Sequence, residues 1–283
     1  MSSQLRTIVH FTESAEQLKG ILSIGFKVKY CRERILFGDT EKVFRLPVVS
    51  FCDIPISEAE ENKSKYGSYA LGLTEDWAIE KGLTPVIYLQ RYSHLAESLL
   101  KSVDLVVENE IRNAIESNSK LRSGDSSLSL LDAFLKFPKE NEFRPMEEDP
   151  LMNALDVIRY TKNYIGTLIR REGDPILGYY FADEREWRYA LKTKHFHQFI
   201  CMDDMANSDG IAVMMQRLID NERLLFSSGD IRYIIIKREE ERSDIEGHIQ
   251  SLTELFTEEE MENLLQKIYT FDQITKVKGV DSR

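Results

Sequence analysis

A stretch of alternating residues in the C-terminal half constrains the fold more than any other part of this chain. Within residues 184–191, Glu184, Glu186 and Arg188 fall on one side, and the aromatic side chain of Trp187 falls on the other. This period of two is typical of a β-strand. On a strand the two glutamates share one face and lie roughly 7 Å apart, at about 3.3 Å per residue. The chain therefore has to form a sheet that accommodates an acidic pair.

The acidic pair needs partners, because a carboxylate that is buried without them costs free energy. One interpretation is a structural cluster at the edge of a sheet, in which Arg185 and Arg188 pair with Glu184 and Glu186. The other interpretation is a functional site that uses the two carboxylates. The alternation alone leaves both interpretations open.

The chain is predicted to be one elaborated domain of the α+β class, since strand patterns flank a long helical region. Leu46–Cys52 and Ile231–Lys237 are apolar runs of strand length, whereas apolar residues between them recur at helical intervals. We predict four parts: the N-terminal half of a sheet core (1–92), a helical insertion (93–171), the C-terminal half of the sheet core (172–242) and C-terminal helices (243–283).

Two of the predicted helices lie at the end of the insertion and near the C-terminus. Pro150–Ile169 has helical periodicity and closes the insertion. Near the C-terminus, Thr257 and Glu260 match the spacing of a capping box, which predicts a helix that starts there and extends to Tyr269.

The N-terminal strand is expected to present polar side chains at its carboxyl end. An apolar run ends in His10-Phe11-Thr12, and Ser14 then caps a helix, with Gln17 as its capping-box partner. The start of a helix offers free amide donors and a positive dipole end, which suit an anionic or hydroxyl-rich ligand. His10 and Thr12 are therefore candidate ligand contacts, although a single histidine at a strand end is more often structural.

Charge and composition exclude several classes of protein. Lys and Arg number 37 against 48 Asp and Glu, so the formal net charge is -11. Long-range attraction to nucleic acid or to an anionic membrane is therefore excluded, and nucleic acid is possible only through a local groove. The N-terminus has no signal-peptide core and no apolar run approaches 18 residues, so we expect a cytoplasmic protein without a membrane segment.

Motifs for metal, thiol and phosphate chemistry are missing from the sequence. His195 and His197 could offer two imidazoles, but no further ligands stand at a recognisable spacing, and we predict no metal site. The three cysteines include no CxxC pair and have apolar neighbours, which indicates reduced core thiols. P-loop and GxSxG patterns are absent.

Two resemblances connect the separate candidate residues. His10-Phe11-Thr12 followed by the pattern Leu-x-x-Ile-Leu-x-x-Gly-Phe, here Leu18 to Phe26, is similar to the opening of several ADP-ribosyltransferase-like families, among them the DarT-type DNA ADP-ribosyltransferases. A longer set of motifs resembles the AbiGi abortive-infection family, which is described as a phage-resistance antitoxin. The set comprises His10–Thr12, Tyr30–Glu33, Val49–Pro55, Tyr66–Tyr69 and Asp183–Arg188, of which the SFCDIP segment is fairly specific.

The transferase resemblance implies a split mixed sheet that grips NAD as a substrate. It implies that Glu186 holds the nicotinamide-ribose hydroxyl and stabilises an oxocarbenium-like transition state, and that Glu184 orients or deprotonates the acceptor. His10 would bind the adenine-side ribose, with Thr12 near the nicotinamide amide. Where such families commonly carry a tyrosine on the second strand, this chain has Ser50-Phe51. The remaining NAD contacts are therefore assigned to Ser50, Phe51 and Tyr69.

The function expected from both resemblances is antiphage defence by transfer of ADP-ribose to a macromolecular acceptor. The alternative is a catalytically inactive antitoxin that keeps the same fold and binds a cognate toxin or another neighbouring-gene product. A generic domain with a structural Glu/Arg cluster is the third possibility.

Overall fold

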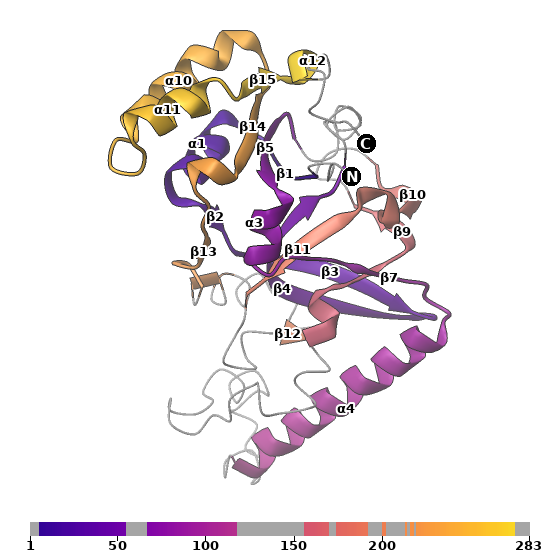
Figure 1. The fold of residues 1–283 in the computed structure, drawn as a ribbon. Helices are drawn as coiled ribbons and strands as arrows, with labels where there is room; N and C mark the ends of the chain where they lie inside the picture. The colour runs from indigo at the N-terminus through magenta and orange to yellow at the C-terminus, as the bar shows by residue number, and fades with distance from the viewer. Residues whose placement is uncertain are drawn as a thin grey trace.

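A mixed nine-stranded sheet forms the centre of the chain (Figure 1). The computed structural model describes residues 6–54, 67–117, 156–169, 174–191, 200–201, 213, 216–217 and 219–274. Along the sheet the strands follow the order β15 (Ile268–Thr270), β14 (Ile231–Ile236), β5 (Tyr69–Thr74), β1 (Thr7–Thr12), β4 (Thr40–Cys52), β11 (Glu186–Ala190) and β6 (Thr84–Pro85). Two further strands, β3 (Lys29–Phe37) and β12 (Ile200–Cys201), also pair with β4. The predicted α+β class is confirmed.

Strand β4 organises the sheet because several strands share it. β3 pairs with residues 40–48 of β4, and β11 pairs with residues 48–52. β1 meets β4 at one position, Val9 with Cys52. Since β3 and β11 both reach Val48, they lie on opposite edges of β4, and β1 follows β3 along the same edge. Between these two neighbours, none of the described strands pairs with the edge of β4 at residues 49–51.

Helix α1 (Ala15–Ile24) follows β1 as predicted. The Ser14 hydroxyl caps it by accepting a hydrogen bond from the backbone N–H of Gln17. The Gln17 side chain does not complete the box on Ser14 but turns back to the Thr12 hydroxyl and the Glu13 backbone N–H. Gly25 ends the helix with a φ of 79°, a left-handed conformation that costs glycine little.

The hairpin of β3 and β4 is an element that the strand patterns did not predict. Phe37 pairs with Thr40 across a two-residue loop, Gly38-Asp39, and Gly38 has a φ of 61°. Glycine followed by aspartate between strand-like runs is a recognised hairpin signal. The signal is therefore present in the sequence, next to the apolar alternation of Ile35 and Phe37.

Helices pack at the two ends of the sheet (Figure 1). α4 (His94–Ser117) covers the β3–β4 hairpin through Ala96, Leu99 and Val103. α10 (Arg242–Ser251) and α11 (Glu258–Leu265) pack near α1, in the core cluster that holds Leu18 and Leu22. Further helical elements of the described chain are α3 (Glu75–Glu80), α12 (Phe271–Ile274) and the short 3-10 turns η2 (Phe181–Glu184), η4 (Ser228–Asp230) and η5 (Glu239–Glu241). None of the described helices is long and apolar enough to cross a bilayer.

Three small sheets complete the described chain, and two of them correct the predicted helix Pro150–Ile169. The strand pairs are β2 (Phe26–Lys27) with β13 (Arg223–Leu224), β7 (Ile87–Leu89) with β8 (Thr161–Asn163), and β9 (Ile165–Leu168) with β10 (Ile176–Tyr180). The structure describes helix only at 156–159 in that region, and residues 150–155 lie outside its described part. Parallel pairing with β7 and antiparallel pairing with β10 stabilise strands where local periodicity favoured helix.

Two predicted boundaries also move. The predicted capping box at Thr257 and Glu260 is confirmed, but α11 ends at Leu265, and residues 268–270 form β15 beside β14. The strand predicted from Glu184 begins at Glu186. Glu184 ends the turn η2, and Arg185 adopts a left-handed conformation with a φ of 44°.

Candidate functional site

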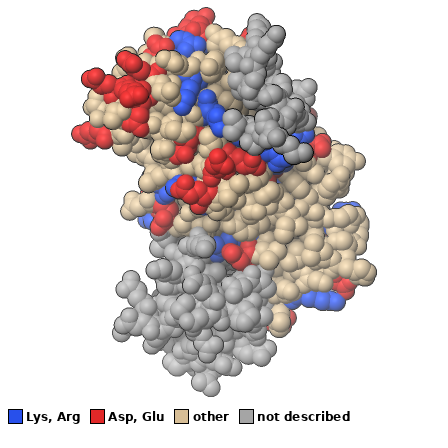
Figure 2. All heavy atoms as spheres, in the orientation of Figure 1, with Lys and Arg blue, Asp and Glu red and all other residues tan. Residues whose placement is uncertain are grey.

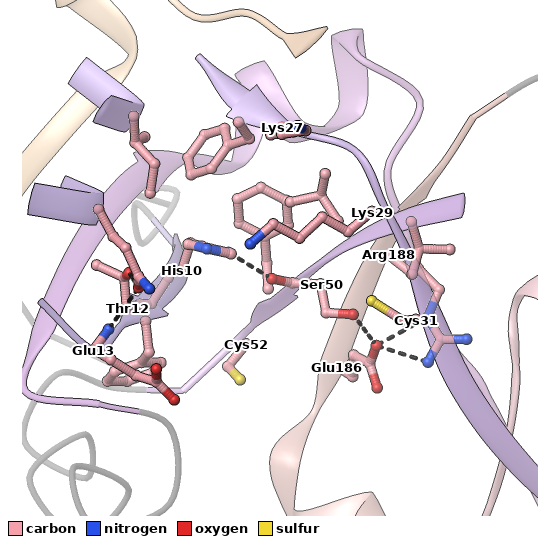
Figure 3. A pocket seen from close by; sticks show the side chains of 18 of the residues that line it. His10, Thr12, Glu13, Lys27, Lys29, Cys31, Ser50, Cys52, Glu186 and Arg188 are labelled. Atoms are coloured by element: carbon pink, nitrogen blue, oxygen red, sulfur yellow. Dashed lines mark hydrogen bonds and ion pairs between the residues drawn. The ribbon is translucent and has the colours of Figure 1, made fainter. Parts of the chain in front are cut away.

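A pocket opens at the gap along the edge of β4. Its volume is about 570 Å³. It is lined by β1, α1, the β2–β3 segment and residues 48–52 of β4, and by the charged side chains of Lys162, Glu184, Glu186 and Arg188. Figure 3 shows the side chains around it, with His10 and Ser50 on facing strands. The pocket lies where β1 and β3 diverge, so that this stretch of β4 pairs with β11 on one edge and with none of the described strands on the other.

His10 crosses the gap and takes the place of a missing backbone hydrogen bond. Its Nδ1 lies 2.9 Å from the carbonyl oxygen of Ser50. A carbonyl only accepts, so Nδ1 carries the proton and Nε2 is left as an acceptor. Burial lowers the pKa of His10 to about 4, and the imidazole is therefore neutral near pH 7. The ring packs against Phe26 and Phe51, at centroid distances of 5.0 Å and 5.4 Å.

Ser50 and Glu186 are joined by a short hydrogen bond. The Ser50 hydroxyl donates to Oε1 of Glu186 over 2.6 Å. Register brings the two side chains to one face of the sheet, because Glu186 pairs with Cys52 and Arg188 pairs with Ser50. Arg188 donates to the same carboxylate from Nε, over 2.9 Å, and is itself 2 % exposed. Figure 3 shows these three side chains grouped on one side of the pocket.

Lys162 connects the two glutamates of the acidic pair. Its Nζ lies 2.8 Å from Oε2 of Glu184 and 2.9 Å from Oε2 of Glu186. Arg188 extends the network with a contact of 3.0 Å to Oε2 of Glu33 and a hydrogen bond to the backbone carbonyl of Arg159. We call the five charged residues the buried charge cluster: Glu33, Lys162, Glu184, Glu186 and Arg188.

Opposite charges decide the protonation state inside the buried charge cluster. Burial acts to raise the pKa of Glu186, but Arg188 and Lys162 outweigh it and hold that pKa at about 2. For Lys162 and Arg188 burial acts to lower the pKa, and the surrounding carboxylates raise both pKa values above their usual range. Burial raises the pKa of Glu33. Glu186 is therefore an ionised carboxylate at neutral pH, next to the pocket.

The pocket brings together six of the seven predicted site residues. They are His10, Thr12, Ser50, Phe51, Glu184 and Glu186. Tyr69 lies beside Thr12 in the sheet but does not line the pocket. Its hydroxyl donates to Glu241 over 2.8 Å, and burial raises its pKa to about 12.

Comparison with known proteins identifies the family. Residues 25–237 match the family model described as "Putative abortive phage resistance protein AbiGi, antitoxin". The chain belongs to the AbiGi family. A curated member, "Abortive phage resistance protein AbiGi" of Lactococcus lactis subsp. cremoris, is 24% identical over 245 residues, which cover 82% of this chain and 89% of that protein. No solved structure matches the chain.

The range shared with the AbiGi family contains the buried charge cluster. It includes all of β4 and β11, and thus Ser50 and Glu186, whereas His10 and Thr12 precede its first residue. Lys162 and Glu33 also fall within it. Sequence patterns did not select Lys162, because it lay inside a predicted helix, and Glu33 appeared only within the YCRE segment of the resemblance.

The structural interpretation of the acidic pair is partly correct for this AbiGi chain. Arg188 does pair with Glu186, but the pair is buried between β4 and β6 rather than placed at an open sheet edge. Arg185 is exposed. Metal-ligand geometry is not found among the described His, Cys, Asp and Glu residues, and His195 and His197 lie outside them.

Proposed function

We propose that this AbiGi chain acts in abortive phage resistance and that its pocket binds NAD and transfers ADP-ribose to a macromolecular acceptor, on an ADP-ribosyltransferase-like core. The observation that carries the proposal is the hydrogen bond from Ser50 to the ionised Glu186, in a pocket that His10 closes from the facing strand. A buried carboxylate of low pKa beside an open pocket is a typical feature of a site that stabilises developing positive charge.

The pocket has the size and polar groups that a ribonucleotide needs. A volume of about 570 Å³ lies within the range of cofactor pockets, roughly 300–1,000 Å³. The neutral His10 offers an acceptor at Nε2, and the hydroxyl oxygen of Ser50, which donates its proton to Glu186, can accept; both suit ribose hydroxyl groups. Lys29 is exposed on the pocket wall and suits a diphosphate, and Figure 3 shows it next to His10.

The chain's own residues divide the proposed reaction between them. NAD supplies an activated bond between ribose and nicotinamide, and nicotinamide leaves with the bonding electron pair. Glu186 stabilises the positive charge that develops on the ribose, and Ser50 fixes the orientation of that carboxylate. Glu184 lies beside Glu186 through the shared Lys162 and accepts the proton of the attacking group of the acceptor.

Paired substitutions at Ser50 and Glu186 test the proposed activity. We expect Glu186→Gln to lower NAD consumption by roughly 100-fold or more, since it removes the charge that stabilises the transition state. Ser50→Ala keeps the carboxylate and is expected to cost about tenfold, the value of one hydrogen bond to a charged group. NAD loss and nicotinamide release are followed by chromatography, and ADP-ribose adducts by mass spectrometry of lysate from phage-infected cells.

The matched control is Ser102→Ala, which removes an exposed hydroxyl from α4, far from the pocket. It is expected to retain full activity. If calorimetry detects no binding of millimolar NAD, and no NAD is consumed in the presence of the toxin encoded by the neighbouring gene, the proposal is wrong.

A second candidate function is that of an antitoxin that acts by binding its cognate toxin without catalysis. Exposed apolar side chains on the β9–β10 hairpin favour it: Leu177 is 79% exposed, Tyr180 49% and Ile165 37%. Figure 2 shows a largely uncharged surface there, whereas acidic residues gather over α10 and α11. This candidate predicts a stable complex with the toxin and equal neutralisation by wild type and Glu186→Gln. Loss of neutralisation in that variant would favour the catalytic function instead.

A further inference from the structure

Lys162 occupies the position that makes the acidic pair possible. Its ammonium group contacts both Glu184 and Glu186, at 2.8 Å and 2.9 Å, and lies 4.8 Å from the ring centre of Phe181. Only 14% of the Lys162 side chain is exposed, and the side chains of Glu184 and Glu186 are 5% and 4% exposed. At such burial a carboxylate needs a charge partner or hydrogen-bond donors close by, and Lys162 contacts both carboxylates.

The strand that carries Lys162 is held in place independently of the acidic pair. The neighbouring Asn163 donates from Nδ2 to the carbonyl of Leu36 and accepts from the Leu36 backbone N–H, over 3.0 Å and 2.7 Å. β8 also pairs with β7 over three residues. The backbone of Lys162 is therefore anchored without the acidic pair, and its ammonium group reaches both carboxylates from this strand.

Glu184 and Glu186 belong to two different backbone segments. Glu184 ends the 3-10 turn η2, and the left-handed Arg185 separates it from the strand residue Glu186. The two side chains consequently do not share a strand face through a regular alternation. Lys162 is a contact that the two carboxylates share.

We propose that Lys162 is a positioning residue of the pocket: its ammonium group clamps Glu184 and Glu186 and keeps Glu186 ionised and directed at Ser50. The role in catalysis rests on the proposed function, whereas the clamp itself can be tested without any ligand. Lys162 acts through the two carboxylates.

Among the described residues, charged and titratable groups from several elements surround Glu186. They are Glu33 and Cys31 on β3, Tyr88 on β7, Lys162 on β8, Glu184 on η2 and Arg188 on β11. The Tyr88 hydroxyl accepts from the Glu186 backbone N–H over 2.7 Å, and burial raises the pKa of Tyr88 to about 12, so it stays neutral. The buried charge cluster has three carboxylates and two cations, and removal of Lys162 leaves Arg188 as its one cation.

The first experiment measures the protonation of Glu186 in ligand-free protein. Carboxyl ¹³C shifts of labelled glutamate are followed against pH by NMR, and Glu186→Gln assigns the signal. We expect Lys162→Met to raise the pKa of Glu186 by at least one unit, a tenfold change in its acidity constant, and Lys162→Arg to keep most of the wild-type value. Lys101→Met, which removes an exposed ion pair with Glu97, is the matched control and is expected to change nothing. An unchanged Glu186 titration in Lys162→Met would overturn the proposal.

A second variant keeps the proposal testable if Lys162→Met does not fold. Lys162→Met with Glu184→Gln removes one charge of each sign and restores the charge balance of the wild-type cluster. We expect this double variant to unfold at a higher urea concentration than the single variant. Equal or lower resistance to urea would show that Lys162 acts by packing and would overturn the clamp.

The same variants separate the clamp from the proposed activity. On acidification, NAD consumption by Lys162→Met is expected to fall at a higher pH than that of wild type, because Glu186 takes up its proton earlier in the variant. If Lys162→Met shifts Glu186 but wild type neither binds nor consumes NAD, the proposed function fails and the clamp stands. A wild-type-like pH profile of NAD consumption in Lys162→Met would overturn the clamp and leave the proposed function intact.

Discussion

The protonation state of His10 follows from the burial of its side chain between β1 and β4. Burial lowers its pKa from 6.5 to about 4 in the folded protein. Between these two pH values the unfolded chain binds the proton and the folded chain does not, so the free energy of unfolding rises with pH. The contribution of His10 to stability is therefore complete above about pH 6.5 and is lost as the pH falls toward 4.

A substitution that cannot titrate tests this pH dependence. We expect His10→Gln to lose less stability than wild type when the pH is lowered from 7 to 4.5, measured by urea unfolding at each pH. His94→Gln is the control, because it replaces a histidine whose side chain is fully exposed. Parallel curves for wild type and His10→Gln would contradict the assigned cause.

Single residues of the site were predictable where chemistry is visible in one stretch of sequence. Glu184 and Glu186 stood out because two carboxylates enter an aromatic strand pattern, and both line the pocket. Lys162 carries no such local signal. Its role depends on contacts with residues 22 and 24 positions later in the chain, and no periodicity encodes them.

Strands β5 and β14 pack closely where Gly72 of β5 lies against the ring of Tyr233 of β14. A Cβ atom at Gly72 of β5 would lie 2.4 Å from the ring of Tyr233, which is 1% exposed. The ring cannot move without disturbing the core, so we expect Gly72→Ala to destabilise the protein by roughly 1–3 kcal/mol. Urea unfolding measures the change.

Gly247 provides the matched control within a helix. A Cβ atom there has no neighbour within 4 Å, and alanine is favoured over glycine inside α10. Gly247→Ala is expected to stabilise the protein by about 0.5–1 kcal/mol. We therefore predict that the free energy of unfolding falls in Gly72→Ala and rises in Gly247→Ala. Changes of the same sign in both variants would contradict this prediction.

Elements with a strong local signal were predicted from sequence, and those that depend on distant pairing were not. Caps at Ser14 and Thr257 fixed the starts of α1 and α11. β8 and β15 carry helical periodicity but are strands, because each pairs in parallel with a strand far away in sequence. Parallel partners of this kind lie beyond the reach of any local pattern.

The arrangement of the whole sheet depends on which strands pair with β4 and over how many residues. β1 shares six paired positions with β5 but one with β4, whereas β11 shares five with β4. The part of the sheet that contains β1, β5, β14 and β15 is thus joined to the part around β4 at Val9 and Cys52 and by the side chain of His10. We call these two parts the two halves of the sheet. A split sheet was expected from the resemblance to transferases, but the position of the gap depends on registers that the sequence does not encode locally.

The join between the two halves of the sheet can be measured by hydrogen exchange. His10→Phe keeps an aromatic ring against Phe26 and Phe51 but removes the donor to Ser50. The loss of one hydrogen bond, about 1 kcal/mol, is expected to speed exchange roughly fivefold in peptides that cover residues 7–12 and 49–52.

Peptides from the β3–β4 hairpin serve as the internal control for that measurement. Residues 29–37 pair with residues 40–48 independently of His10, so their exchange is expected to stay at the wild-type rate. A uniform increase over the whole chain would mean that His10→Phe lowers global stability instead of loosening the join. Unchanged exchange at residues 49–52 would mean that Val9 and Cys52 hold the two halves together without His10. The increase in exchange is expected only near residues 49–52 because the Ser50 carbonyl, on the unpaired edge of β4, accepts its cross-strand hydrogen bond from the His10 side chain.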